Sequence, residues 1–360
     1  MAEFKDRIPH TGGQLTIHKQ GARYQLQYVH QNLNQAALVE LVAVDGEPFE
    51  WINIVDEMSG RRPAHPPLRI EFPTDAEAMW GRSCSKCKSY FRAAMPYTEL
   101  CPYCDHKADS LAFLTDSQRA FIKRQFDAIV AAMAGPDGET TINFESTAAD
   151  SWAYTEEKQQ THFECTACKM EFDVLGDYVR CPQCGLRTTR QVIERRLNDI
   201  ASDFEHDATS IPKDQRDQRQ RRWRHHITAC VAEFEAFARD ITASLAALPS
   251  TPRRRKAVNE LSLMSIKSAD EKLRDWYGIE LLTGIGQGER DFVNTMFNRR
   301  HLFAHSGGKV DQEYLDKTGD ATVRLNEVIR VDSGEVRRLI MLVRQTAQNL
   351  QSERESIAKP

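Results

Sequence analysis

One stretch decides the fold of the C-terminal third, Asn298-Arg299-Arg300-His301-Leu302-Phe303-Ala304-His305-Ser306-Gly307-Gly308. It ends an amphipathic helix whose apolar residues recur at the helical period, and Arg300 falls where this pattern reserves an apolar residue. A guanidinium on a packed face needs an anionic partner or a cleft, because an unpaired buried charge is costly. The pattern therefore singles out Arg300 as a candidate site residue.

Two histidines follow Arg300 in the same helix. Val293, Phe297, His301 and His305 are each four residues apart, so we expect both imidazoles along the edge of the apolar stripe. Gly307-Gly308 ends the helix and leaves His305 in its last turn, where the helix dipole favours the protonated imidazole. An arginine for a phosphate and a titratable imidazole suffice for phosphodiester chemistry. A metal site on the two histidines would need a third ligand, and none is evident.

Apolar periodicity predicts a helical bundle around this stretch. We expect a long helix over residues 223–248, a second over 256–277, the helix of Arg300 and His305, and a last helix that begins at Asp332 and extends to residue 350. Residues 323–331 alternate with a break and predict a short strand. Four helices with such faces form a bundle.

This region resembles the HEPN-domain ribonucleases. Arg300-His301-x3-His305 is similar to their R-x4-6-H motif, and residues 307–315 look like the segment that follows the motif in many bacterial members. The resemblance covers roughly residues 217–355 and implies an all-α HEPN-like bundle over residues 213–356. It implies that Arg300 and His305 are catalytic, and that His301 either contacts phosphate or fills a polar position that the motif tolerates.

The activity implied by the resemblance is that of an endoribonuclease. Such an enzyme cleaves RNA without a catalytic metal, by attack of the ribose 2′-OH, and leaves 2′,3′-cyclic phosphate and 5′-hydroxyl ends. The family brings two motifs together in one cleft, which implies a homodimer through the C-terminal bundle. It further implies a nuclease toxin or anti-phage (antiviral) defence effector with RNA as its substrate.

Eight of the nine cysteines fall in four Cys-x2-Cys pairs, a spacing typical of metal ligands in a reducing compartment. The pairs are 13 residues apart in the first set and 12 in the second, which predicts zinc ribbons at residues 78–108 and 161–190. Four thiolates leave no open position, so each Zn2+ is expected to be structural. The ligands are Cys84, Cys87, Cys101 and Cys104 in the first ribbon and Cys165, Cys168, Cys181 and Cys184 in the second. Cys230 is expected to be a core residue.

The remaining segments complete a multidomain α+β protein. Residues 1–77 predict a β-rich unit, with a hairpin around residues 19–22 and apolar runs at 37–44 and 49–55. Residues 109–160 predict a helical connector with a helix over 111–133. Residues 191–212 predict a helix and a linker, with the best domain boundary in the polar segment 206–214.

The net charge of −4 does not suggest a globally basic nucleic-acid binder, so any such surface has to be local. Two cationic clusters are candidates for RNA contact. The first contains Lys213, Arg216, Arg219, Arg221, Arg222 and Arg224, and the second contains Arg253, Arg254, Arg255 and Lys256. The cations and aromatic rings near the first ribbon either bind RNA or merely surround and fill its small core. With no apolar membrane span or signal-peptide core, we expect a cytoplasmic protein without a membrane partner.

Two functions therefore stay open on the sequence alone. One is the metal-independent endoribonuclease, and the alternative is a non-catalytic zinc-ribbon nucleic-acid-binding protein that dimerises through the helical bundle. The β-rich unit and the ribbons are the places where a trigger or partner protein is expected to act. Growth inhibition that depends on Arg300 and His305 favours the nuclease, whereas effects that depend on the basic clusters and ribbons favour the binding protein.

Overall fold

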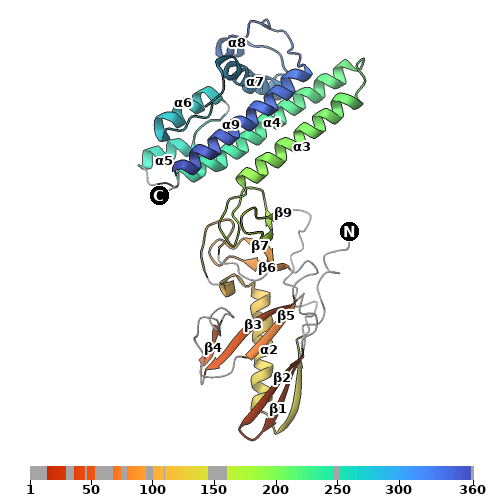
Figure 1. The fold of residues 1–360 in the computed structure, drawn as a ribbon, viewed down its shortest axis with the longest axis vertical. Coiled ribbons are helices and arrows are strands. Elements are labelled where there is room, and N and C mark those ends of the chain that lie inside the picture. The colour runs from red at the N-terminus through yellow and green to blue at the C-terminus, as the bar shows by residue number, and fades with distance from the viewer. Residues whose placement is uncertain are drawn as a thin grey trace. The chain divides into compact units, whose positions relative to one another are not determined.

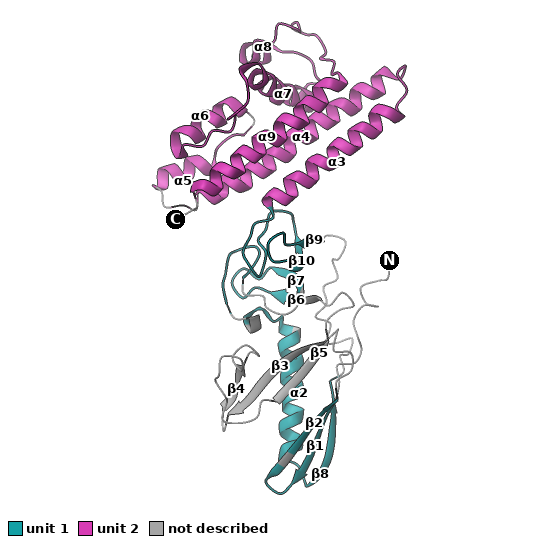
Figure 2. Ribbon diagram, viewed as in Figure 1, with its two compact units in different colours: residues 1–188 teal, residues 189–360 magenta. Residues whose placement is uncertain are grey.

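The computed structural model describes residues 14–29, 36–44, 47–52, 68–73, 79–94, 100–108, 110–144, 160–246, 248, 251–263 and 265–357. They belong to two compact units, residues 1–188 and residues 189–360 (Figure 2). Strands occupy the first unit and a helical bundle forms the second, so the predicted α+β class is confirmed. Within the described residues, no helix has the length and apolar character needed to cross a membrane.

The first sheet contains the predicted hairpin. β1 (Gln14–Gln20) and β2 (Arg23–Val29) pair antiparallel around Gly21, whose φ of 62° suits glycine in a tight turn. β8 (Gly138–Asn143) pairs with the other edge of β1, which gives the order β2-β1-β8. The predicted unit 1–77 is therefore not self-contained, because a strand from the predicted connector 109–160 completes its sheet. Residues 1–13, 53–67 and 145–159 of these two segments lie outside the described residues.

The helix of this region covers that sheet. η3 (Ser110–Phe113) precedes α2 (Asp116–Ala134), and Thr115 separates them by capping α2 in a capping box with Gln118. The predicted helix over 111–133 is thus divided at its start. α2 and the sheet share one core that contains Leu15, Ile17, Phe121, Ile129 and Phe144. A separate antiparallel sheet of β3 (Ala36–Val44), β4 (Glu47–Ile52) and β5 (Leu68–Pro73) has the order β4-β3-β5.

The two cysteine-rich segments share one sheet. β6 (Met79–Ser83) and β7 (Tyr90–Ala94) come from the first segment, and β9 (Gln160–Glu164) and β10 (Glu171–Leu175) come from the second. β7 pairs antiparallel with β10, which gives the order β6-β7-β10-β9. The segments that the sequence predicts as separate ribbons are therefore two halves of a single module, named the double ribbon below.

The C-terminal unit is the predicted helical bundle. The long helices α3 (Thr189–Ser210), α4 (Arg216–Ala246) and α9 (Ser333–Ile357) lie side by side (Figure 1). α7 (Gln287–His305) packs against α4 and α9, where Phe297 meets Phe234 edge to face. The shorter helices are α5 (Pro252–Asn259), α6 (Ile266–Tyr277) and α8 (Gln312–Thr318). Cys230 is fully buried in α4, as predicted for a core residue.

Two predicted elements of this unit are wrong. The helix expected over 256–277 is two helices, because α5 ends at Glu260 and Ser265 caps the start of α6. The strand expected over 323–331 is an irregular segment with an isolated bridge between Lys309 and Val328. The side chain of Gln220 on α4 bonds both the N–H and the C=O of Val331, so this backbone is satisfied without a neighbouring strand.

The units also divide at a different place from the predicted boundary. α3 continues through residues 206–210 and packs against α4 and α9, so the division lies between residues 188 and 189. Most polar side chains of this segment, such as His206, Thr209 and Ser210, are exposed, and Asp207 is the one that is buried among its described residues. Asp207 is buried and accepts hydrogen bonds from Arg222 at 2.7 Å and from His226 at 2.7 Å. Residues 191–210 therefore belong to the bundle as part of α3, and Asp207 is paired inside this unit.

Candidate functional site

The motif stretch ends α7 as the sequence predicts. The N–H groups of Ser306 and Gly308 both donate to the carbonyl of Leu302, each at 2.9 Å, which closes the helix. Gly307 and Gly308 have φ values of 64° and 87°. A Cβ on Gly308 would lie 3.0 Å from the ring of Phe303, so this turn needs glycine for space as well as for conformation.

Arg300 has an anionic partner, as the sequence pattern requires, but the more deeply buried arginine of α7 is Arg299, which the pattern does not single out. Arg299 is 5% exposed and donates to Asp320 at 2.8 Å, to Glu335 at 2.7 Å and to the hydroxyl of Tyr314 at 3.1 Å. These bonds tie α7 to α8, to the loop after α8 and to the start of α9. All of the charge on Arg299 is thus compensated inside the protein, so this arginine has a structural role.

Arg300 is held loosely by comparison. Its side chain is 19% exposed and its Nη2 donates to Glu235 of α4 at 3.3 Å. The Nε of Arg300 and the Oε1 of Glu235 are buried without a hydrogen-bond partner among the described residues. A buried ion pair with two unused polar atoms can accept a further ligand more readily than a saturated one. Glu235 was not identified from the sequence. Its signal is a carboxylate that follows Val231 by four residues and so falls on the apolar stripe of α4.

His301 and His305 are both exposed to solvent, with ring centroids 4.5 Å apart. Their spacing of four residues places them on one face of α7, as predicted. Arg300 does not join them, because residues five apart on a helix point about 140° away from each other. Within the described chain, the polar contact of Arg300 is with Glu235. The structure therefore brings the two imidazoles together and leaves Arg300 on the side of α7 that faces α4.

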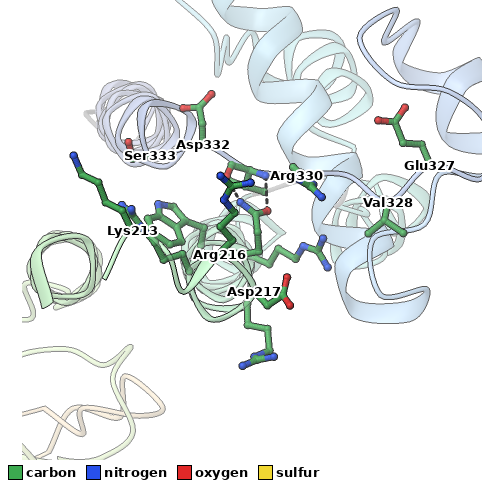
Figure 3. Close-up of a pocket in the computed structure, with 14 residues that line it drawn as sticks. Lys213, Arg216, Asp217, Glu327, Val328, Arg330, Asp332 and Ser333 are labelled. Carbon is green, nitrogen blue, oxygen red and sulfur yellow. Dashed lines mark hydrogen bonds between the residues drawn. The ribbon is translucent and has the colours of Figure 1, made fainter. Parts of the chain in front are cut away.

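A basic pocket of about 910 Å3 lies where α4 begins, against the segment that leads into α9 (Figure 3). Arg219 lies over the ring of Trp223 at 4.5 Å. Four further lining cations are exposed and form no side-chain hydrogen bond or ion pair with the described residues; they are Lys213, Arg216, Arg221 and Arg330. Three carboxylates also line the pocket, Asp217, Glu327 and Asp332. The cations outnumber the acids, so the pocket suits an anionic ligand.

Only part of the first predicted cluster is available to a ligand. Arg219 and Arg221 line the pocket, whereas Arg222 is bonded to Asp207. Arg224 also lines it, but its guanidinium donates to the carbonyls of Gly307 and Ile329. Lys213 and Arg216 of the same predicted cluster also line the pocket, and Arg330 joins it without having been predicted. Arg330 is distant in sequence, and no pattern in the sequence connects it with α4.

Arg224 connects the basic pocket to the end of α7. It donates to Gly307 at 2.9 Å, and Gly307 is two residues beyond His305. The second predicted cluster, Arg253, Arg254, Arg255 and Lys256, lies on α5, which follows the opposite end of α4. α4 has 31 residues. Because an α-helix rises ~1.5 Å per residue, the end of α4 at Ala246 lies roughly 33 Å from Arg224. The structure therefore joins the first cluster to the motif and leaves the second apart from it.

The eight predicted zinc ligands form two four-cysteine groups. Within each group the sulfur atoms all lie within 4.8 Å of one another. In the first group the sulfur atoms of Cys84 and Cys104 are 3.7 Å apart and those of Cys87 and Cys101 are 3.6 Å apart. In the second group the pairs Cys165–Cys184 and Cys168–Cys181 are each 3.5 Å apart. A tetrahedral zinc site with Zn–S bonds of ~2.3 Å spaces its sulfurs by about 3.8 Å. The geometry is therefore consistent with two structural zinc sites.

All four cysteine turns have the same backbone. The N–H of the first cysteine in each pair bonds the carbonyl five residues on, at 2.8 to 3.0 Å. The residue before that carbonyl is left-handed in each turn: Lys88, Asp105, Lys169 and Gly185. Three of the four are not glycine, and holding them at positive φ requires a strong local constraint. Four sulfurs on one metal ion supply such a constraint.

Several cations of the double ribbon form internal contacts. Arg92 is buried and pairs with Asp173 at 2.8 Å, and Arg82 is also buried. Arg180 pairs with Asp105. Arg190, in the first turn of α3 in the other unit, pairs with Glu194. Phe91 is buried and fills the core between the strands. The burial of Phe91 favours the interpretation of this ribbon aromatic as core, while Lys86, Lys88 and Lys107 of the module are exposed.

No protein-family model matches this chain. No curated protein and no solved structure matches it either.

Proposed function

We propose that this chain is an endoribonuclease whose reactive groups lie at the C-terminal end of α7. The observation that carries the proposal is the pair of exposed imidazoles, His301 and His305, with ring centroids 4.5 Å apart. A histidine titrates near neutral pH and can therefore either accept or donate a proton during phosphodiester cleavage. Two adjacent imidazoles at an exposed helix end supply both kinds of group.

The basic pocket supports a polynucleotide substrate. Its cations lie next to the motif, since Arg224 lines the pocket and bonds Gly307. A phosphate backbone that follows Lys213, Arg216, Arg221 and Arg330 is guided towards the end of α7. Lys and Arg side chains without internal partners are the groups that can release counterions from RNA when they bind it.

The proposed reaction breaks one bond and forms one bond. His305, in its neutral form, accepts the proton of a ribose 2′-OH, and the 2′-oxygen attacks the adjacent phosphorus. The bond between phosphorus and the 5′-oxygen breaks, and a second, protonated imidazole donates a proton to that oxygen. The products are a 2′,3′-cyclic phosphate and a 5′-hydroxyl, and the two histidines exchange their protonation states.

Arg300 is the candidate group for stabilising the phosphorane charge. Its guanidinium pairs with Glu235 through one 3.3 Å hydrogen bond and retains an unused Nε. Reaching phosphate requires Arg300 to turn towards the histidines while Glu235 holds the other side of the guanidinium. Glu235 is therefore a positioning residue for Arg300 in this proposal. A bidentate arginine contact to phosphate is among the strongest hydrogen-bonding arrangements in proteins.

The second imidazole has two sources. In one chain it is His301, which is already in contact with His305. In the homodimer expected from the family resemblance, the second set of groups comes from another copy of the chain. A mixture of inactive Arg300→Ala and His305→Ala proteins distinguishes the two sources. Recovered activity on mixing supports a cleft shared between copies, and no recovery supports His301 of the same chain.

The two metal sites have a structural part in the proposal. Each four-cysteine group holds one Zn2+ through thiolates, and the zinc ions stabilise the double ribbon. The catalytic groups lie in the other unit, so the chemistry described above uses side chains alone. Toxicity to a host cell follows from unrestrained RNA cleavage, and is the basis for expecting a toxin or defence effector.

The substrate side of the proposal is tested with a synthetic RNA and a matched DNA. We expect cleavage of the RNA, and resistance of the same oligonucleotide when a single 2′-deoxy residue precedes the cleaved phosphate. Cleavage of the deoxy substrate at that bond contradicts attack by the 2′-OH. Binding of RNA without cleavage, dependent on the basic pocket, supports the non-catalytic nucleic-acid-binding protein instead.

A further inference from the structure

A stripe of polar side chains leads along α7 to the histidine pair. Asn294, Asn298, His301 and His305 follow at intervals of four, three and four residues, so all four lie on one face of the helix. Val293, just before the stripe, and Met296, Phe297 and Leu302, between its residues in sequence, are buried. The stripe therefore does not belong to the packing face of α7.

This stripe borders a second hollow, the polar pocket, which has a volume of about 410 Å3 and lies between α6, α7 and α8. Asn294, Asn298 and His301 all line it. His301 is thus shared between the polar pocket and the histidine pair. A ligand group in the pocket adjoins the proposed position of the scissile phosphate.

The two pockets differ in charge. The polar pocket is lined by two cations and three carboxylates, Lys267, Lys317, Glu271, Asp311 and Glu313. The basic pocket is lined by six cations and three carboxylates. A phosphate is therefore favoured in the basic pocket and disfavoured in the polar pocket. The group that fits the polar pocket is uncharged and rich in hydrogen-bonding atoms.

The amide of Asn298 is partly available for such a group. Its Nδ2 donates to the carbonyl of Asn294 at 2.8 Å, which uses one of the two amide hydrogens. One N–H and the Oδ1 remain, and these are a donor and an acceptor side by side. Adenine presents the matching pair, the N7 acceptor beside the N6 donor, which asparagine recognises through two hydrogen bonds. The hydrogen-bonding edges of unstacked RNA bases are open to such recognition.

We propose that the polar pocket is a nucleobase subsite that prefers adenine, read by Asn298, on a ribonucleotide next to the scissile phosphate. This inference rests on the proposed function for its position beside the histidines. It adds a substrate preference that neither the motif nor the basic pocket supplies. Asn298 is a specificity residue in this account and takes no part in the proton transfers.

The test measures equilibrium binding to the full-length chain by calorimetry, with adenosine 3′-monophosphate, cytidine 3′-monophosphate and base-free ribose 5-phosphate as probes. We expect the adenosine probe to bind more tightly than the other two. Asn298→Ala should weaken adenosine binding by about tenfold, which corresponds to ~1.4 kcal/mol and is within the range for a good bidentate contact. Equal binding of all three probes overturns the subsite, because it shows phosphate recognition alone.

Two further variants keep the test independent of folding. Asn298→Asp has the same size but lacks the amide donor, and should lose the preference for adenosine. Gln348→Ala removes an exposed amide that lines a different pocket, between α3 and α9, and should bind like the wild type. An Asn298→Ala protein that folds and binds the adenosine probe as tightly as the wild type contradicts the proposal.

Cleavage experiments separate this proposal from the proposed function. If the wild-type protein cleaves RNA and Asn298→Ala cleaves the same sites at the same relative rates, the nuclease activity is supported and the adenine subsite is contradicted. If the protein cleaves no RNA but Asn298→Ala weakens adenosine binding, the adenine subsite is supported and the nuclease activity is contradicted. A change from adenine-flanked to unselective cleavage in Asn298→Ala supports both.

Discussion

Arg299 and Arg300 are neighbours in sequence with different surroundings. Arg299 is buried by α7, α8 and the start of α9 and bonds Asp320, Glu335 and Tyr314. Burial opposes the charge on Arg299, but these bonds outweigh that effect and raise its pKa. Burial raises the pKa of Tyr314 to about 12, and its bond to Asp320 adds to the shift. The network fixes the loop after α8 against the helix that carries the histidines.

Replacing Arg299 with leucine should destabilise the C-terminal unit strongly. The substitution leaves Asp320, with 5% of its side chain exposed, and Glu335 without their cation. Breaking a buried ion pair on one side costs about 3–5 kcal/mol of unfolding free energy. Urea unfolding followed by circular dichroism measures the change. Arg216→Ala, at an exposed cation without an internal partner, is the control and should change stability by less than about 0.5 kcal/mol.

Asp320 gives this network a pH dependence. Burial alone would raise the pKa of Asp320, but hydrogen bonds from Thr322, Tyr314 and Arg299 outweigh it and lower the pKa below the ordinary 3.8. A lowered folded-state pKa adds stability above pH 3.8, and this contribution is lost as the pH falls from there towards the folded-state value. Asp320→Asn should therefore have a lower free energy of unfolding than wild type at pH 7. The difference between the two proteins should become smaller below about pH 4. A difference in unfolding free energy that does not change with pH contradicts this role of the Asp320 carboxylate.

The arginines and histidines of α7 show which side-chain contacts the sequence can predict. Helical periodicity indicates that α7 carries a buried arginine, but adjacent residues differ by only about 100° around the helix axis. Identifying Arg299 as a second buried arginine requires the position of Asp320, which lies in a loop without a regular pattern. The histidine pair needed no such information, because a spacing of four residues within one helix brings side chains together.

At the scale of elements, the double ribbon has an approximate local two-fold arrangement. The N–H of Leu100 bonds the carbonyl of Pro182, and the N–H of Arg180 bonds the carbonyl of Pro102, each at 3.0 Å. Leu100 and Arg180 occupy the same position, directly before a Cys-Pro-x-Cys turn. Each metal site is therefore braced by the backbone of the other.

The strand pairing follows the same symmetry. Arg92 and Asp173 are each five residues after the second cysteine of their segment, and they face each other across β7 and β10. Their ion pair is buried, with 2% and 7% of the side chains exposed. Two identical ribbons would place like charges at this position, so the opposite charges favour pairing of the first segment with the second.

The two metal sites should therefore depend on each other. Cys84→Ser with Cys87→Ser removes two ligands of one site, and we expect zinc to be lost from both sites. Elemental analysis of purified protein should give well below one zinc per chain, compared with two for the wild type. Cys230→Ala, at a buried cysteine outside both sites, should retain two. A stable content of one zinc per chain in the double variant contradicts the coupling.

Element prediction from the sequence succeeded where the pattern was local. The Cys-x2-Cys pairs, the β1–β2 hairpin and the long helices depend on spacings within one segment. The pairing of β7 with β10 joins segments about 80 residues apart and has no sequence signature. The irregular segment before α9 has strand-like alternation, but Gln220 of α4 satisfies its backbone instead of a neighbouring strand.

At the scale of the whole molecule, RNA binding should depend on one basic cluster and not on the other. Arg216, Arg221 and Arg330 line the basic pocket, whereas Arg253, Arg254 and Arg255 lie on α5. Alanine at the first three should weaken RNA binding and reduce the slope of log K against log salt by about 2, since each lost single-strand phosphate contact removes ~0.7. Fluorescence anisotropy over a range of salt concentrations measures both.

The triple variant of Arg253, Arg254 and Arg255 is the matched control for this experiment. It removes the same number of positive charges from the same unit. A general electrostatic effect would therefore reduce RNA affinity equally in both triple variants. We expect its affinity and salt slope to stay close to those of the wild type. A larger loss in this variant than in the pocket variant contradicts the assignment of the RNA path to the basic pocket.

The measurement that tests the central claim most directly compares wild type with His305→Ala in RNA cleavage. The reaction contains enough EDTA to remove free metal, elemental analysis confirms that bound zinc is retained, and the product ends are identified. We predict cleavage by the wild type with 2′,3′-cyclic phosphate and 5′-hydroxyl ends, and loss of that cleavage in His305→Ala, whose exposed position should leave the fold unchanged. Equal cleavage by the two proteins, or products with 3′-hydroxyl ends, would contradict the account.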